Sequence, residues 1–580
     1  MEGKMGSSVN CKTFIGATNI ISSLGFSSKD NFAAAIEYQS GIKQVNDKSI
    51  FESPLLAAQI DKNRLEIEAA KLNLNEFTTL EKLLILSIKD VLNSSSIDIS
   101  KEDCAIIFST TKGNIDVLKN NTQALDEKLF LNKMASRVSN YFGAKNEPLV
   151  ISNACISGVS ATIIASRLIR EEKYNHVIVT GGDLLTEFVV TGFTAFKSVS
   201  EKPCIPYDGN RDGLTLGEGV ATMLVTNNKA LSTGIIIEGG AITNDANHIS
   251  GPSRTGDGLC YAMQQAMNET NLTVSDISFI NAHGTATPFN DEMESKAINM
   301  AQLQTLPVNS LKPYFGHTLG GAGLIELAMC AEQLKSNTLL ATKGFTQLGV
   351  PEPIIISGMH QTLPMKRCIK TASGFGGCNG AIVLALENVG INTKINLVSP
   401  SKITTSIAIN KGKIVKDDMV IFENSEPFHD FVRAAFKSLE ASNMKFYKMD
   451  DLCKLGYLAT EYLLKNQTFI PSEVAIILAN RSSSLDTDIK HQNILNEKPE
   501  TGVSPAVFVY TLPNVVLGEI AIRHKIQGEN SFFIQSEYDS KFIESYAQMV
   551  LNRENYKAVI FGWCEFLGES YNADFKLLEK

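Results

Sequence analysis

Short apolar runs alternate with amphipathic stretches from about residue 12 to residue 390. Continuous apolar runs bounded by turn residues are typical of strands buried on both faces, and the stretches between them carry apolar residues at helical spacing. The runs predicted to be strands are TFIGATNII, CAIIFST, PLVISNA, HVIVTGG, GVATMLV, ISFINAHG and AIVLALE. This alternation predicts an α/β fold.

The pattern weakens in the polar stretch NTKINLVSPSKITTS, from residue 392 to residue 406, and then resumes. DMVIFEN, VAIILAN, PAVFVYT and KAVIFGW continue the strand–helix alternation toward the end of the chain. A chain of 580 residues is too long for one ordinary core. A second folding unit is therefore expected beyond about residue 395.

Part of the first unit recurs in the second. CAIIFSTTKGNID (104–116) matches VAIILANRSSSLD (474–486), and EPLVISNACISG matches ENSFFIQSEYDS some 45 residues later in each copy. This order and spacing predict an internal duplication whose second copy holds only a first half; two unrelated α/β segments are the alternative. In this register Glu537 stands where Cys155 stands.

Composition narrows the class of protein. Apolar residues make up 44% and charged residues 20%, which is typical of globular proteins, and the net charge of −9 argues against a partner bound through nucleic-acid phosphates. No run approaches the roughly 18 apolar residues of a membrane span, and the N-terminus lacks an apolar signal core. Ten cysteines without a C-x-x-C pair fit neither a disulfide framework nor a zinc site. We expect a cytoplasmic protein with no membrane span.

Cys155 lies in VISNACISGVSA, between a predicted strand and a predicted helix. The start of a helix directs backbone N–H groups and a positive dipole end at such a side chain, which favours a thiolate and a nucleophile. The alternative is a buried structural cysteine. Because the second copy is predicted to make the same turn with Glu537 at its tip, the turn does not require a cysteine, which favours the catalytic interpretation.

Two histidines lie in loops rich in small residues, His283 in NAHGTATPFND and His317 in KPYFGHTLGGAG. Such loops bring an imidazole close to a ligand, although a lone histidine is more often structural. Lys312 and Glu326 flank His317, so they are candidates for a shared buried polar network; an exposed salt pair is the alternative.

Two further glycine-rich stretches, YDGNRDGLTLGEGVA and SGFGGCNGAIVL, precede apolar strands. Neither fits a phosphate loop or a dinucleotide-binding fingerprint, and no metalloprotease motif or cluster of metal ligands occurs. Nucleotide binding and a catalytic metal are therefore not expected.

Five segments together carry a resemblance to a known family. NACISG, RDGLTLGEG, HGTATPFND, KPYFGHTLGGAG and GFGGCNG, spread over about 380 residues, resemble an elongating β-ketoacyl-ACP synthase of the thiolase superfamily, the Cys-His-His type. Thiolases use a second catalytic cysteine, and the initiating synthases carry Cys-His-Asn. The resemblance implies a thiolase-like layered fold of helix, sheet, helix, sheet and helix, followed by a degenerate half-thiolase unit.

The resemblance also implies residue roles. Cys155 would accept an acyl chain as a thioester, with the backbone N–H groups of Cys155 and Phe375 as the oxyanion hole. His283 and His317 would bind the malonyl thioester carbonyl and stabilise the enolate that forms when carbon dioxide leaves. No resident cofactor or metal is implied, because the substrates arrive on the phosphopantetheine of acyl carrier protein.

Supporting roles follow from the same resemblance. Lys312 and Glu326 would orient the histidines and tune local charge, and Phe375 would gate the acyl pocket. Two positions depart from the family pattern: Ser373 replaces a large residue near the gate, and Cys378 replaces threonine, which we interpret as a change in packing.

The predicted organisation is a synthase domain over 12–392, with halves of about 12–232 and 233–392, and a degenerate half-domain over 403–580. The predicted activity is decarboxylative Claisen condensation with malonyl-ACP in fatty acid, polyene or polyketide biosynthesis. The predicted partners are acyl carrier protein and a second subunit, in a homodimer or in a heterodimer with a chain-length-factor-like subunit. The alternative function is a non-catalytic partner that binds acyl carrier protein.

Overall fold

The computed structural model describes residues 12–120, 125–390, 400–440, 443–497 and 503–580. Its main strands form three sheets that share a set of five strands in the same order; β13 (Ile355–Ile356) extends the second sheet, and β18 (Lys413–Lys416) and β19 (Met419–Glu423) extend the third. In each sheet the first three strands are parallel and the last two are antiparallel. The first sheet runs β5 (Leu149–Ile151), β4 (Cys104–Ser109), β6 (His176–Asp183), β8 (Gly219–Thr226) and β1 (Thr13–Ser22).

The second sheet runs β11 (Pro307–Asn309), β10 (Phe279–Asn281), β15 (Arg367–Gly374), β16 (Cys378–Leu386) and β9 (Ile235–Asn244). The third runs β21 (Asn530–Ile534), β20 (Val474–Asn480), β22 (Ala558–Leu567), β23 (Ser570–Glu579) and β17 (Lys402–Asn410). The runs that the sequence predicted as strands in the first unit are strands of the first two sheets, as predicted.

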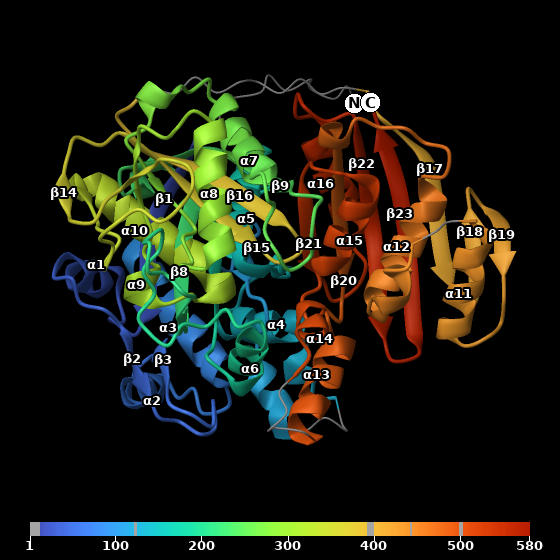
Figure 1. Ribbon diagram of the computed structural model, residues 1–580, viewed down its shortest axis with the longest axis horizontal. Coiled ribbons are helices and arrows are strands. Elements are labelled where there is room, and N and C mark those ends of the chain that lie inside the picture. The colour runs from blue at the N-terminus through green and yellow to red at the C-terminus, as the bar shows by residue number, and fades with distance from the viewer. Residues whose placement is uncertain (1–11, 121–124, 391–399, 441–442, 498–502) are drawn as a thin grey trace.

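Helices separate and cover the first two sheets (Figure 1). α5 (Ser157–Arg170) and α10 (Ala322–Ser336) pack between them, with α3 (Thr79–Ser95) on the outside of the first sheet and α7 (Asp257–Asn268) on the outside of the second. This is the helix, sheet, helix, sheet, helix layering of a thiolase-like fold. α5 is buried at every residue except Arg170, as expected for a middle layer.

The C-terminal unit, residues 400–580, lies beside the first sheet (Figure 1). β21 pairs antiparallel with β5, opposing Phe533 to Ile151, so the first and third sheets join edge to edge. Behind this junction Arg167 of α5 donates to Glu529 at 2.7 Å, and both side chains are buried. α12 (Asp451–Leu463) and α16 (Ser540–Leu551) pack on the third sheet.

One sequence prediction in this unit was wrong. PAVFVYT is not a strand: residues Pro505–Val509 form the short helix α14, because proline suits the first helical position and a short apolar run does not distinguish helix from strand. The polar stretch in which the pattern weakens contains the start of β17, whose alternating burial marks a half-buried strand. The rest of that stretch, up to residue 399, lies outside the described residues.

No helix in the described part of the chain combines the length and apolarity that a membrane crossing needs. The described cysteines are all buried free thiols.

Candidate functional site

Cys155 lies on a tight turn between β5 and α5. Ala154, just before it, has φ +48°, a left-handed conformation that is costly for a residue with a Cβ. The Ser157 hydroxyl braces the turn, since it accepts from Asn153 N–H at 2.9 Å and donates to the Ala154 carbonyl at 2.6 Å. The thiol is therefore held at the start of α5, with 9% of the residue exposed.

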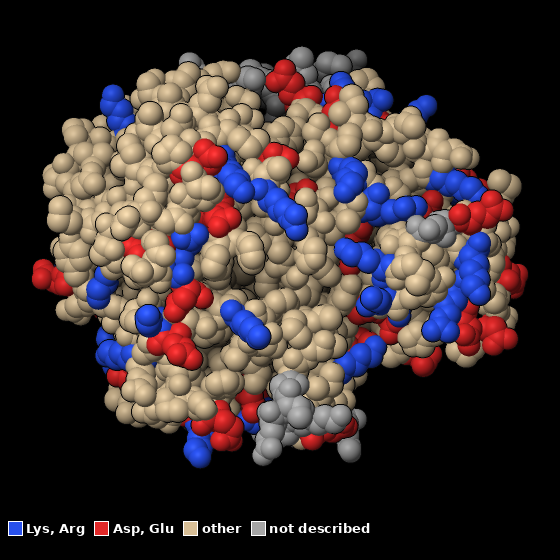
Figure 2. Space-filling view, viewed as in Figure 1, with Lys and Arg blue, Asp and Glu red and all other residues tan. Residues whose placement is uncertain are grey.

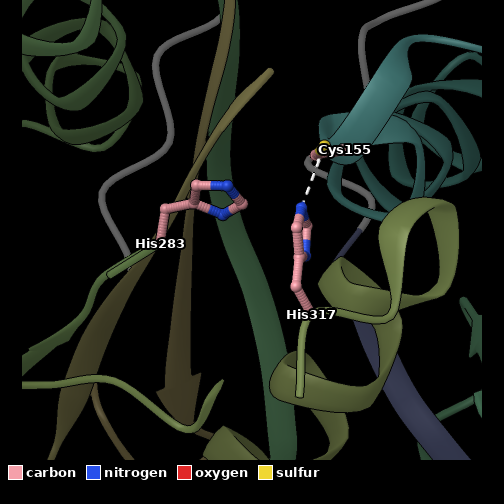
Figure 3. A group of neighbouring side chains, drawn as sticks. All are labelled: Cys155, His283 and His317. Atoms are coloured by element: carbon pink, nitrogen blue, oxygen red, sulfur yellow. Dashed lines mark hydrogen bonds between the residues drawn. The ribbon is translucent and has the colours of Figure 1, made fainter. Parts of the chain in front are cut away.

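His317 and His283 converge on this thiol from separate elements (Figure 3). His317 follows α9 (Lys312–Phe315), and its Nε2 lies 3.1 Å from Cys155 Sγ. His283 follows β10, and its backbone N–H donates to Glu294 at 2.8 Å. The two ring centroids are 5.2 Å apart with the rings nearly perpendicular. Three motifs distant in sequence therefore meet at one point.

Lys312 and Glu326 form a buried ion pair of 2.5 Å, so the alternative of an exposed salt pair was wrong. Glu326 also bridges to Lys370 of β15, again at 2.5 Å. Lys370 was not predicted, because its signal in the sequence is a single lysine inside an apolar strand. One carboxylate thus lies between two buried ammonium groups, which leaves excess positive charge behind the histidines.

This charge and burial set the protonation states. Burial, and after it the charge of Lys312, holds the pKa of both His283 and His317 well below the ordinary range, so both imidazoles are neutral at pH 7. Burial raises the pKa of the Cys155 thiol to about 12, although Lys312 opposes this. The expected resting thiolate was therefore wrong, because desolvation of the sulfur outweighs the helix start.

Phe375 lies in the turn that joins β15 to β16, against the Cys155 turn. A Cβ added to Gly374 would meet Cys155 N at 3.1 Å, so the two backbones are in close approach. Cys378 is fully buried and donates to the carbonyls of Asn153 and Phe375, in line with a packing role. The Ser373 hydroxyl donates to Asn379 at 2.7 Å.

A cavity of about 280 Å³ opens onto the site. Cys155, both histidines and Phe375 line it, and the Phe375 ring lies within 6 Å of the rings of Phe193 and Phe196. In Figure 2 a hollow is visible near the centre of the face, and Lys and Arg are interspersed with Asp and Glu around it. The structure thus groups four predicted residues around one cavity, with Lys312 and Glu326 buried behind the histidines.

The Cys155 thiol and the two imidazoles are also the one group among the described residues whose donor atoms are spaced to hold a metal ion, all within 4.8 Å of one another. No metal is expected from the sequence. Neutral imidazoles can bind a metal ion and can also act as hydrogen-bonding groups beside a thiol nucleophile.

Glu537, the counterpart of Cys155 in the second copy, is exposed and lies three residues before α16. No left-handed residue corresponds to Ala154 among the described residues between 526 and 561. The copy therefore repeats the strand and the helix but not the tight turn, so the expectation that the turn forms equally without cysteine was wrong.

Comparison with known proteins agrees with this geometry. Residues 81–230 match the sequence profile described as beta-ketoacyl synthase, N-terminal domain, and residues 235–346 match the C-terminal domain profile. The 3-oxoacyl-[acyl-carrier-protein] synthase 2 of Vibrio harveyi is 27% identical over 402 residues, covering 63% of this chain and 96% of its own length. That of Staphylococcus aureus is 25% identical over 413 residues, covering 65% and 98%.

Two solved structures show the fold. A beta-ketoacyl synthase from Burkholderia phymatum superposes with a TM-score of 0.59 at 22% identity, covering 65% of this chain and 99% of its own. The PfaC keto synthase–chain length factor superposes with a TM-score of 0.77 at 14% identity, covering 98% of this chain and 78% of its own. The second match includes the C-terminal unit.

Proposed function

We propose that this chain, which matches the β-ketoacyl synthase profiles over residues 81–230 and 235–346, is a synthase of that family and catalyses decarboxylative condensation of a Cys155-bound acyl chain with malonyl-ACP. The proposal rests on the 3.1 Å contact between Cys155 Sγ and His317 Nε2, in a cavity that His283 also lines. A nucleophile with a base in reach is the minimum arrangement for acyl transfer.

In the first half-reaction, Cys155 Sγ attacks the acyl thioester carbonyl. Its proton passes to His317 Nε2, which is neutral and within hydrogen-bond distance. The backbone N–H groups of Cys155 and Phe375 stabilise the oxyanion. The carrier thiol then leaves with the proton, and a thioester remains on Cys155.

In the second half-reaction, His317 takes the tautomer that carries its proton on Nε2, and the neutral imidazoles of His283 and His317 donate hydrogen bonds to the malonyl thioester oxygen. The bond to the carboxylate breaks, carbon dioxide leaves, and its electron pair forms the enolate. The enolate carbon attacks the acyl carbonyl, the Cys155 thiolate leaves, and the thiolate takes up one proton from solvent. Lys312 and Lys370 support this step because their charge keeps the imidazoles neutral and favours a negative oxygen.

The residue roles, the domain boundaries 12–392 and 403–580, and the absence of a metal are parts of this proposal. The thiol and imidazoles act as reactants, so dialysis against a chelator should leave condensation unchanged. Substrates arrive on acyl carrier protein, and fatty acid, polyene or polyketide assembly is the proposed setting. We also propose a cytoplasmic location, supported by the free thiols of the described cysteines.

The C-terminal unit is proposed to act as a built-in pseudo-subunit. A solved relative of this fold is a ketosynthase in complex with its chain length factor, and here residues 400–580 would take the place of that second subunit at the β5 edge. The shared strand order of the first and third sheets supports a duplication. α16 buries only five of its twelve residues, whereas α5, which lies between two sheets, is buried at all but one. The exposed outer face of α16 is therefore consistent with a half-unit that has no second sheet. A remnant kept only for stability is the alternative.

One experiment separates the synthase from a non-catalytic carrier-binding partner. The protein is incubated with acyl-ACP and its intact mass is measured, and malonyl-ACP is then added for product analysis over an acyl series. We expect an acyl adduct that is absent in Cys155→Ala, followed by a β-ketoacyl product. No adduct with any acyl donor would leave only the binding role.

A further inference from the structure

The Phe375 turn is contacted by the C-terminal unit as well as by its own domain. Asn514, which precedes α15 (Val515–His524), donates from Nδ2 to the Phe375 carbonyl at 2.8 Å. Four residues further on, Gly518 lies against the same turn: a Cβ there would meet the Gly376 carbonyl oxygen at 2.6 Å. Backbone of the turn and backbone of the C-terminal unit are therefore in direct contact.

The conformation of Asn514 shows where its side chain is used. It occupies the N-cap position of α15, where an asparagine side chain normally accepts from the first free N–H groups. Asn514 makes no such bond, and its Oδ1 has no hydrogen-bond partner among the described residues although the residue is 1% exposed. The amide is thus directed at Phe375 at the expense of its own helix.

Asn514 Nδ2 also lies 3.7 Å from Cys378 Sγ, and the other hydrogen bonds of the turn come from the synthase domain and hold its glycines. Gly376 N–H donates to the Ile249 carbonyl at 2.6 Å, and Asn244 Nδ2 donates to the Gly376 carbonyl at 2.9 Å. Besides Asn514, the polar contact described for the Phe375 carbonyl is the Cys378 thiol at 3.4 Å, a weak donor. Asn514 is therefore the strong donor that fixes Phe375.

We propose that Asn514 is a positioning residue through which the C-terminal unit holds Phe375 for acyl transfer to Cys155. The inference rests on the proposed function, in which the Phe375 N–H binds the acyl oxyanion. Fixing the carbonyl of Phe375 restricts the backbone on both sides of that residue, and preorganised donors owe their effect to such restriction. The C-terminal unit then contributes to the reaction without carrying a reacting group.

The test compares Asn514→Leu, which removes the amide at similar volume, with the matched control Asn530→Leu. Asn530 is a buried asparagine at the β5–β21 junction whose side chain has no hydrogen-bond partner among the described residues. Two rates are measured for each protein: acylation of Cys155 by acyl-ACP, and alkylation by iodoacetamide. Alkylation at a saturated carbon needs no oxyanion hole, so it reports the thiol alone.

We expect Asn514→Leu to acylate at least about tenfold more slowly, since small misplacements of catalytic groups cost ten- to hundredfold. Its alkylation rate, and both rates of Asn530→Leu, should match those of the unchanged protein. Asn514→Asp, which places a carboxylate against the Phe375 carbonyl, should be at least as slow and serves if the leucine variant fails to fold.

Equal acylation of the Asn514 variants and the unchanged protein would overturn the role of Asn514 while leaving the synthase intact. Parallel losses of acylation and alkylation would reduce it to a structural contact and also overturn it. Failure of the unchanged protein to form an acyl adduct would instead reject the proposed function, and the inference with it.

Discussion

The buried thiol of Cys155 predicts a steep pH dependence for its alkylation. Iodoacetamide reacts with the thiolate, which is scarce at neutral pH when burial raises the pKa to about 12. We therefore expect the rate constant to rise about tenfold per pH unit between pH 7 and pH 9, with no plateau, because the ionised fraction rises by that factor below the pKa.

The magnitude follows from two opposing effects. Raising the thiol pKa from 9.0 to about 12 corresponds to about 4 kcal/mol. The start of α5 offsets at most about 2 kcal/mol, even in a partly buried geometry. Burial prevails, and about one thiol in a thousand or fewer is ionised at pH 7. His317 does not form an ion pair with a Cys155 thiolate in the resting enzyme, because burial and the charge of Lys312 hold the pKa of His317 well below the ordinary range.

The assay is quenched alkylation followed by intact-protein mass, with Cys155→Ser as the control for other thiols. The reasoning would be refuted by a plateau with a midpoint below pH 8, since that result would show a thiolate–imidazolium pair at rest.

Three further substitutions test the charge network, the junction and the pocket. Glu326→Gln removes the carboxylate that bridges two buried lysines, so we expect a loss of about 3–5 kcal/mol in the free energy of unfolding by urea. Glu332→Gln, at a half-buried position of the same helix, is the control, and equal unfolding midpoints of the two variants would contradict the network. Glu529→Gln leaves the buried Arg167 guanidinium without its carboxylate partner, so the C-terminal unit should unfold at a lower urea concentration, as reported by the fluorescence of the single tryptophan, Trp563. An unchanged unfolding midpoint would contradict a stabilising role for this ion pair. Phe508→Ala removes a ring whose centroid lies 5.5 Å from that of Phe193, which lines the cavity, so competition between acyl carriers should shift toward longer chains; unchanged selectivity would show that Phe508 does not limit the cavity.

The candidate site residues were predictable because each signal is local. A strand end followed by small residues marks Cys155, and a loop with glycine and threonine marks each histidine, so the pattern alone identified the candidates and the family resemblance assigned their roles. Their convergence could not be read from spacing, since Cys155 and His317 are 162 residues apart.

The charge environment was not predictable in the same way. Lys370 looks like an outward residue of a strand, and only packing shows that it shares Glu326 with Lys312. The pKa of Cys155 likewise depends on how much water the surrounding layers exclude, which the helix start does not reveal. The repeat shared by the first and third sheets was predicted, but the matching strand order of the second sheet was not, and β17 was not predicted because it is only half-buried.

The pairing of β5 with β21 takes place within one polypeptide. Two edges on a single chain meet at an effective concentration set by the chain, so dilution does not separate them as it separates independent subunits. A symmetric dimer presents each substitution twice, once on either side of its axis. Here a substitution on the C-terminal side of the junction does not also occur on the Cys155 side. The two sides of the junction are therefore free to evolve separately.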